Sequence, residues 1–90
     1  MRTLKLKKQF KKDFKKSNRN PRHDIDKLAY VIDLLIEHGE LSEEYRPHRL
    51  IGNWTPKLEC HIQPDFLLIY EVDDFNVTLY RCGSHSELFL

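Results

Sequence analysis

Two titratable side chains stand on either side of a short, proline-containing turn in the second half of the chain. His61 precedes the turn, Asp65 follows it, and the apolar run 66–72 comes directly after. A run that is apolar at almost every position is typical of a strand covered on both faces. If tight turns join this strand to its neighbours, Arg81 ends the next strand and His85 lies just beyond it, at the same end of the sheet. We therefore expect His61, Asp65, Arg81 and His85 to lie close together.

This combination of side chains favours cleavage of RNA without a metal ion. Histidine titrates near physiological pH, so two histidines can exchange acid and base roles. Arginine binds phosphate oxygens bidentately, and Phe66 can stack on a base. The sequence has no glycine-rich phosphate loop, and no serine or cysteine nucleophile followed by an obvious base. Each residue alone is more often an ordinary surface side chain, so the prediction depends on their convergence.

Metal binding is an alternative use of the same kind of side chain. Ligand-type residues stand at His48, His61, Asp65 and His85. No two of them have the spacing of a recognised metal motif, so we expect neither a metal ion nor a cofactor. Cys60 and Cys82 fit no metal spacing either, and we interpret them as two buried thiols.

The hydrophobic pattern predicts one α+β domain over residues 1–90, with the order β-α-α-β-β-β. Apolar residues recur at three- and four-residue steps over 24–37, and Asp24 and Gly39 suit the two ends of that helix. A shorter helix begins near Lys8, with Phe10 and Phe14 on one face. Strands are expected at 3–7, 54–62, 66–72 and 76–82, and 41–53, which contains His48, is expected to be a loop. The last three strands would form a meander in a mainly antiparallel sheet, with both helices packed on one face.

Positive charge is concentrated near the N-terminus. Residues 1–23 hold ten Lys or Arg and one acidic residue, Asp13, although the whole chain has a net charge of only +1. Such asymmetry suggests that this end binds a polyanion, although lysines on a helix are often simply solvated. The candidates for holding an RNA backbone are Lys7, Lys8, Lys11, Lys12, Lys15 and Lys16. No segment has the ~18 apolar residues of a membrane span, and the N-terminus lacks a signal peptide's apolar region, so we expect a cytoplasmic protein.

Three motifs together resemble a known family. They are His48-Arg49-Leu50-Ile51-Gly52-Asn53-Trp54, the His-x-x-Pro-Asp motif at 61–65 within the stretch 60–70, and the Arg-x-Gly-Ser-His motif at 81–85 within 81–89. In this order they resemble the YafQ branch of the RelE toxin superfamily, the toxins of bacterial type II toxin–antitoxin pairs. The resemblance implies a RelE-like toxin that enters the ribosomal A site, cuts the bound mRNA and is neutralised by a cognate antitoxin. It implies contact with operator DNA only through the antitoxin, and no membrane partner.

The resemblance also carries family roles to individual positions, namely His48, His61, Asp65, Arg81, His85 and Phe89. In the expected scheme, His85 protonates the leaving 5′-oxygen, Arg81 stabilises the phosphate, and His48, His61 and Asp65 share activation of the 2′-hydroxyl. Phe66 and Phe89 would contact the substrate. The products would be a 2′,3′-cyclic phosphate or 3′-phosphate and a 5′-hydroxyl. The sequence departs from the family pattern at Phe66, where this branch often has Trp, and at Leu58, where close relatives often carry Arg.

Three other functions stay open on the sequence alone. A non-catalytic member of the fold would bind its antitoxin and help to repress its own operon; Leu58 is compatible with this, whereas the retained histidines favour catalysis. A general nucleic-acid binder would use the lysine-rich helix and show strong salt dependence, but it gives the histidines no role. A nuclease that acts on naked RNA would need no ribosome.

Overall fold

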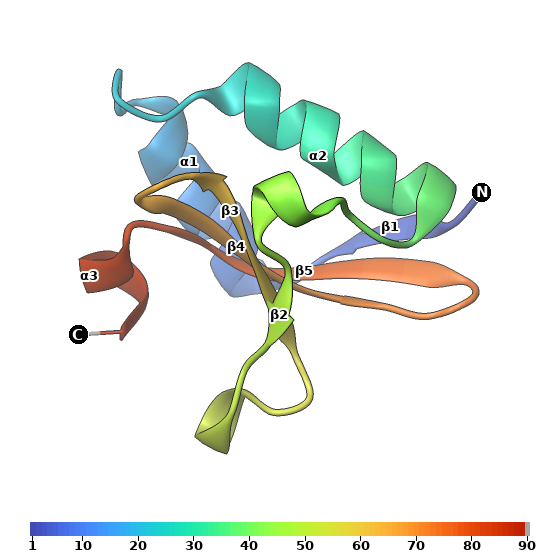
Figure 1. Ribbon diagram of the computed structural model, residues 1–90. Coiled ribbons are helices and arrows are strands. Elements are labelled where there is room, and N and C mark those ends of the chain that lie inside the picture. Colours follow the sequence, from blue (N-terminus) through green and yellow to red (C-terminus); the bar gives the residue numbers. More distant parts are fainter. Residues whose placement is uncertain (90) are drawn as a thin grey trace.

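Five strands form one mixed sheet in the order β1-β5-β4-β3-β2 (Figure 1). The computed structural model describes residues 1–89. The elements along the chain are β1 (Thr3–Leu6), α1 (Lys8–Asn18), α2 (Ile25–His38), the 3₁₀ turn η1 (Glu43–Tyr45), β2 (His48–Arg49), the 3₁₀ turn η2 (Gly52–Trp54), β3 (Leu58–Gln63), β4 (Phe66–Val72), β5 (Asn76–Gly83) and α3 (His85–Phe89). The predicted α+β class is confirmed. The prediction of a loop at 41–53 is wrong, because this segment holds η1 and β2 and the start of η2.

Local signals explain the two long helices. Asp24 caps α2, since its Oδ1 accepts a hydrogen bond from the Lys27 backbone N–H at 3.0 Å. Gly39 ends the helix with a φ of 74°, in the left-handed region that favours glycine. In the described part of the chain, no side chain caps helix α1. The rings of Phe10 and Phe14 stack with their centroids 6.2 Å apart. Because Phe10 is buried, packing rather than capping holds α1 in place.

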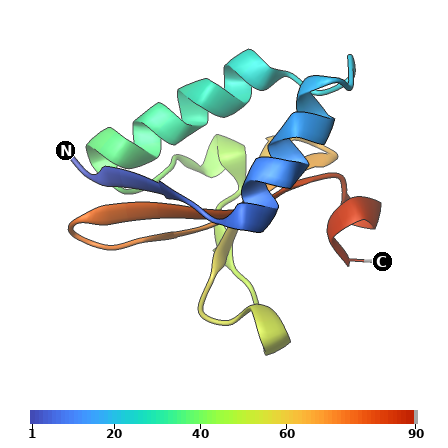
Figure 2. The same cartoon turned by 180° about the vertical axis from the view of Figure 1, so that it is seen from behind.

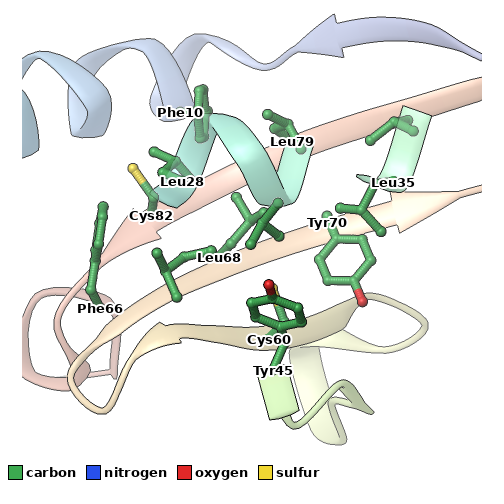
Figure 3. Packing of buried hydrophobic residues seen from close by; sticks show 13 residues of the cluster. Phe10, Leu28, Leu35, Tyr45, Cys60, Phe66, Leu68, Tyr70, Leu79 and Cys82 are labelled. Carbon is green, nitrogen blue, oxygen red and sulfur yellow. The ribbon is translucent and has the colours of Figure 1, made fainter. Parts of the chain in front are cut away.

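Both long helices cover the same face of the sheet and enclose the main hydrophobic core, as predicted (Figure 3). Alternate residues of β3, β4 and β5 point into this layer. The buried side chains include Phe10, Leu28 and Leu35 from the helices and Cys60, Leu68, Tyr70, Leu79 and Cys82 from the strands. Cys60 and Cys82 are free thiols, and burial raises the pKa of each to about 12. The interpretation of both cysteines as buried thiols is therefore confirmed.

A smaller hydrophobic cluster on the opposite face of the sheet anchors α3. Leu67 and Ile69 alternate with the core residues of β4 and therefore point to this second face. Leu88 of α3 packs on them and is only 6% exposed, with Leu50, Trp54 and Tyr80 around the cluster. This packing fixes α3, and with it the residue that begins the helix, His85, at the end of the sheet.

The N-terminal strand closes the other edge of the sheet. β1 pairs in parallel with β5, with Thr3 opposite Asn76 and Leu6 opposite Leu79. Figure 2 shows β1 and α1 lying along β5, on the side away from β3 and β2. The sheet is thus mixed, with antiparallel pairing among β2, β3, β4 and β5. Within residues 1–89 no helix is both long enough and apolar enough to cross a membrane.

Candidate active site

Asp65 and His85 form a close pair at the end of the sheet. The Asp65 side chain lies in the turn between β3 and β4, and its Oδ1 accepts two hydrogen bonds from His85. One comes from the backbone N–H at 2.9 Å and the other from the imidazole Nδ1 at 2.6 Å. These bonds hold the pKa of Asp65 below its usual value, so the carboxylate stays ionised. Because Nδ1 is occupied, the Nε2 atom of His85 is the nitrogen that a substrate can use.

Glu59 joins two further histidines on the neighbouring strands. β2 pairs with β3 so that His48 lies opposite Glu59. The Oε1 atom of Glu59 lies 3.2 Å from Nε2 of His48 and 3.6 Å from Nε2 of His61. The carboxylate itself is buried, at 5% exposure. The Nδ1 atom of His48 lies 2.9 Å from the Arg46 carbonyl oxygen, which can only accept, so Nδ1 carries the proton.

His61 is the most buried of the three clustered imidazoles, with a side chain that is 15% exposed. Burial lowers its pKa, and the nearby Arg46, His85 and His48 side chains lower it further, while Glu59 opposes them. Its Nδ1 is buried and has no hydrogen-bond partner among residues 1–89. His61 is therefore neutral at physiological pH and suited to accepting a proton.

The three imidazoles form a continuous row across β2, β3 and the start of α3. The ring centroids of His48 and His61 are 6.2 Å apart, and those of His61 and His85 are 5.8 Å apart. The predicted convergence of His61, Asp65 and His85 is confirmed. His48, which topology could not place, joins them because β2 pairs with β3.

Arg81 has a different partner from the one expected. Its guanidinium binds Asp13 of α1 bidentately, with Nε 2.6 Å from Oδ2 and Nη2 3.1 Å from Oδ1. The bonds to Asp13 raise the pKa of Arg81, and the side chain is 23% exposed. Arg81 therefore reaches a phosphate only by exchanging the Asp13 carboxylate for it, and its expected role in stabilising the phosphate stays a prediction.

The expectation that Phe66 stacks on a base is wrong. Its side chain points into the core and is only 1% exposed (Figure 3). The imidazole of His23 covers it, with ring centroids 4.1 Å apart and planes only 4° from parallel. A base would have to displace His23 to reach the ring.

The other candidate binding residues are accessible. Phe89 is 41% exposed, and its ring meets Trp54 edge-on at 6.1 Å. All six candidate lysines, Lys7, Lys8, Lys11, Lys12, Lys15 and Lys16, are exposed. Lys7 lies over the Tyr80 ring and Lys16 contacts Glu87 at 3.0 Å. Among residues 1–89, no group of three or more His, Cys, Asp or Glu residues has the arrangement to hold a metal ion.

Nearly the whole chain matches a known family. A family model described as a bacterial toxin of a type II toxin–antitoxin system, YafQ, matches residues 2–90. This chain belongs to the YafQ toxin family. The mRNA interferase toxin YafQ of Escherichia coli strain K12 is 35% identical over 82 residues, which cover 90% of this chain and 88% of that protein. The resemblance to the YafQ branch is therefore confirmed.

Solved structures of YafQ and of a Helicobacter pylori toxin have the same fold. The E. coli DinJ–YafQ complex matches with a TM-score of 0.89 and 33% identity over 100% of both chains. A copper-bound mutant toxin from Helicobacter pylori matches with a TM-score of 0.88 and 46% identity, over 99% of this chain and 100% of that one. These matches confirm the predicted RelE-like architecture.

Sequence reasoning missed Glu59 and His23, two residues at the site of this YafQ family member. The alternation over 54–62 places Glu59 on the same face as His61, which was a usable signal, but nothing in the sequence showed that β2 would bring His48 against it. His23 gave no signal, because it follows the helix-breaking segment 17–21 and its stacking partner, Phe66, lies far along the chain.

Proposed function

We propose that this chain is an mRNA interferase, an endoribonuclease that cuts mRNA in the ribosomal A site by acid–base catalysis without a metal ion. The observation that carries the proposal is the row of three imidazoles, in which Glu59 contacts one pair and Asp65 holds the third. Membership of the YafQ toxin family supports it, because the curated E. coli relative is named an mRNA interferase toxin.

The substrate supplies its own nucleophile in this reaction. A general base removes the proton from a 2′-hydroxyl, whose oxygen then bonds to the adjacent phosphorus. The bond from phosphorus to the 5′-oxygen of the next nucleotide breaks, and a general acid protonates that oxygen. The products are a 2′,3′-cyclic phosphate, which water can open to a 3′-phosphate, and a 5′-hydroxyl end.

The geometry supports a division of the two proton transfers between the two ends of the row. His48 and His61 both direct Nε2 at Glu59, so these three side chains form one proton-accepting group. His85 presents its free Nε2 at the other end and would protonate the leaving oxygen. Asp65 belongs with His85 in this scheme, whereas the family resemblance led us to expect it in the base group.

Positively charged side chains on α1 and β5 would neutralise the negative charge of the phosphate and of the RNA backbone. Arg81 can bind the phosphate only if it exchanges Asp13 for it. The exposed lysines of α1 form a positive surface that suits ribosomal RNA and mRNA backbones. Phe89 offers an exposed ring for a base.

The proposal includes a cognate antitoxin as partner. YafQ of E. coli is seen in a complex with DinJ. By analogy, an antitoxin would neutralise this chain, and operator DNA would be contacted only through it. Action on ribosomes would place the protein in the cytoplasm.

Primer extension on mRNA bound to purified ribosomes tests the proposal. Wild-type protein should create new 5′ ends inside the A-site codon, and none on the same RNA without ribosomes. His85→Ala should lose about 10²- to 10⁴-fold in rate, the usual contribution of a general acid. If folded wild-type protein cuts nothing on ribosomes, the non-catalytic alternative replaces this proposal. Cutting of naked RNA would show a ribosome-independent nuclease instead.

A further inference from the structure

A cleft of about 510 Å³ opens next to the row of imidazoles. It lies between the segment that connects α1 to α2, the turn between β3 and β4, and the start of α3, and we call it the connector cleft. The residues that matter among its lining are Asn20, Arg22, His23, Gln63, Asp65 and Ser86. None of the catalytic roles assigned above, apart from that of Asp65, involves this space.

The connector cleft lies on the His85 side of the site. Asp65 lines it, and so do Ser84 and Ser86, which flank His85 in the sequence, whereas His48 and His61 do not. In the proposed reaction His85 protonates the 5′-oxygen of the nucleotide that follows the cut. That nucleotide must therefore extend from His85 away from the base group, which is the direction of the cleft.

The aromatic surface of the connector cleft belongs to His23. Phe66 also lines the cleft, but it is only 1% exposed and lies flat against the His23 ring. His23 is only partly buried and lines the cleft, so its imidazole is the ring that a base can contact there. Its Nδ1 is itself buried and lacks a hydrogen-bond partner among residues 1–89, so the exposed part of the ring is the part that a base can meet. A planar ring supported from behind by a second ring is a suitable platform for base stacking.

Gln63 holds the walls of the connector cleft together. Its Oε1 accepts a hydrogen bond from the Asp24 backbone N–H at 2.8 Å, and its Nε2 donates to the Arg22 carbonyl oxygen at 3.2 Å. Asn20 Oδ1 accepts a further bond from the Arg22 backbone N–H at 2.9 Å. These bonds leave the Arg22 guanidinium exposed at the edge of a preformed space, where it can meet a phosphate.

We propose that the connector cleft binds the nucleotide on the 3′ side of the cut, with its base on His23 and its 3′-phosphate at Arg22. The inference rests on the proposed endonuclease function, which it extends with a defined binding site for one substrate nucleotide. It predicts that the cleavage rate depends on the base at this position, and that His23 mediates this dependence.

A combined change in protein and RNA tests the stacking contact. Ribosome-bound mRNAs with a normal or an abasic nucleotide 3′ of the cut are cleaved under single-turnover conditions by wild type, His23→Ala and His23→Phe. The abasic RNA should slow wild type about tenfold, the loss typical of one base stacking on an aromatic ring. His23→Ala should be slowed about tenfold on normal RNA but no further on abasic RNA, and His23→Phe should resemble wild type. Two results would overturn the proposal. In one, His23→Ala and the abasic nucleotide each slow cleavage and their factors multiply when they are combined; in the other, wild type cuts abasic and normal RNA at the same rate.

Substitutions of exposed arginines test the phosphate contact without the risk that the variant fails to fold. Arg22→Ala should cut more slowly with all four bases by a similar factor, because it removes a phosphate contact rather than a base contact. Arg19→Ala is the matched control: Arg19 is exposed and has the same charge but does not line the cleft, so its rate should stay near wild type. Equal rates for Arg22→Ala and Arg19→Ala would refute the phosphate contact, even if His23→Ala fails to fold.

Failure of the proposed function can be separated from failure of this inference. If wild type cuts no ribosome-bound mRNA, the endonuclease proposal fails, and the cleft is tested by NMR titration with adenosine 3′-monophosphate. This probe carries the 5′-hydroxyl and 3′-phosphate of the nucleotide after cleavage. Shifts around the connector cleft that disappear in His23→Ala would support the binding site, and their absence in wild type would overturn it.

Discussion

Among residues 1–89, the Asp65 carboxylate bonds only to His85, whereas Glu59 contacts both His48 and His61. The two carboxylates also differ in exposure, because Asp65 lies in an open turn and Glu59 is buried. Loss of Asp65 should therefore disturb the protonation of the leaving oxygen, and loss of Glu59 should disturb the removal of the 2′-hydroxyl proton. Single substitutions can distinguish the two halves of the site.

Asp65→Asn tests the half that contains His85. The amide keeps the size of the side chain but cannot accept the His85 bonds as a charged group. We expect the cleavage rate to fall at least about tenfold, less than the loss in His85→Ala, because the imidazole stays in place. Asp74→Asn, an exposed residue of another turn, is the control in the same single-turnover assay. A wild-type rate for Asp65→Asn would remove Asp65 from the mechanism.

Glu59→Gln tests the other half through the pH dependence of the rate. The pKa of His61 is lowered, so the proton-accepting form persists below the usual histidine pKa of ~6.5, and the rate should fall only at lower pH. The Glu59 charge raises this pKa, so removing the charge should move the acidic limb of the profile to still lower pH, with a reduced plateau. A limb that moves to higher pH would contradict the assignment of His61 to the base group.

At the scale of secondary-structure elements, α3 depends on tertiary contacts for its position. It has only five residues, so its own hydrogen bonds cannot keep it helical, and Leu88 anchors it to β4. The fold therefore places His85, the proposed general acid, on a short element that is held by the apolar contacts of Leu88 and by polar contacts of its first turn with Asp65 and Lys16.

Leu88→Ala should weaken that anchor. We expect the free energy of unfolding to fall by about 2 kcal/mol, at the lower end for a Leu→Ala change in a small cluster. The cleavage rate should also fall under conditions where the protein is fully folded, because His85 is no longer held in place. Urea denaturation and single-turnover cleavage measure the two effects. Ile51→Ala, at a residue 87% exposed, should change neither; a Leu88→Ala protein that loses stability but keeps its full rate would show that α3 needs no anchor.

The sequence predicts elements better than it predicts the contacts between them. Tight turns fix the meander, and this was enough to bring His61, Asp65 and His85 together. The pairing of β2 escaped prediction, because a two-residue strand has no periodicity to detect. Without its register, the contact between His48 and Glu59 cannot be deduced.

The sequence also did not predict two contacts between residues that lie far apart in the chain, one between charged side chains and one between aromatic rings. The pairing of Arg81 with Asp13 depends on how α1 packs beside β5, which hydrophobic patterning does not specify. Phe66 belongs to a run that is apolar on both faces, and such a run does not reveal which side chains face the helices. The sequence therefore indicated that Phe66 is buried, but not that His23 covers its ring.

At the scale of the whole molecule, most of the positive charge lies away from His48 and His61. The exposed lysines belong to α1 and to the residue just before it, and α1 packs on β5 (Figure 2), whereas His48 and His61 belong to β2 and β3; among the described residues, Lys16 alone reaches α3, through Glu87. Affinity for ribosomes or RNA should therefore respond strongly to salt, while the chemistry at the histidines responds less.

Lys11→Ala tests this separation. The slope of log affinity against log salt concentration should become shallower by about 0.7–0.9, the value for one lost phosphate contact. The single-turnover rate at saturating toxin should not change. Lys27→Ala on α2, where the lysine lies over Tyr45, is the control and should leave the slope unaltered. Equal slopes for wild type and Lys11→Ala would show that this face of α1 is only solvated.

The pairing of β1 with β5 affects when the toxin can become active during its own synthesis. A nascent chain carries β1, α1 and α2 early, but Thr3 must wait for Asn76 before it has a strand to pair with. Such long-range pairing delays folding until nearly the whole domain has been translated. His48 and His61 are made before His85 and the helix that holds it. Under the proposed function, the incomplete chain cannot yet cut mRNA on the ribosome that makes it, and a partner protein can bind the toxin as soon as its last residues emerge.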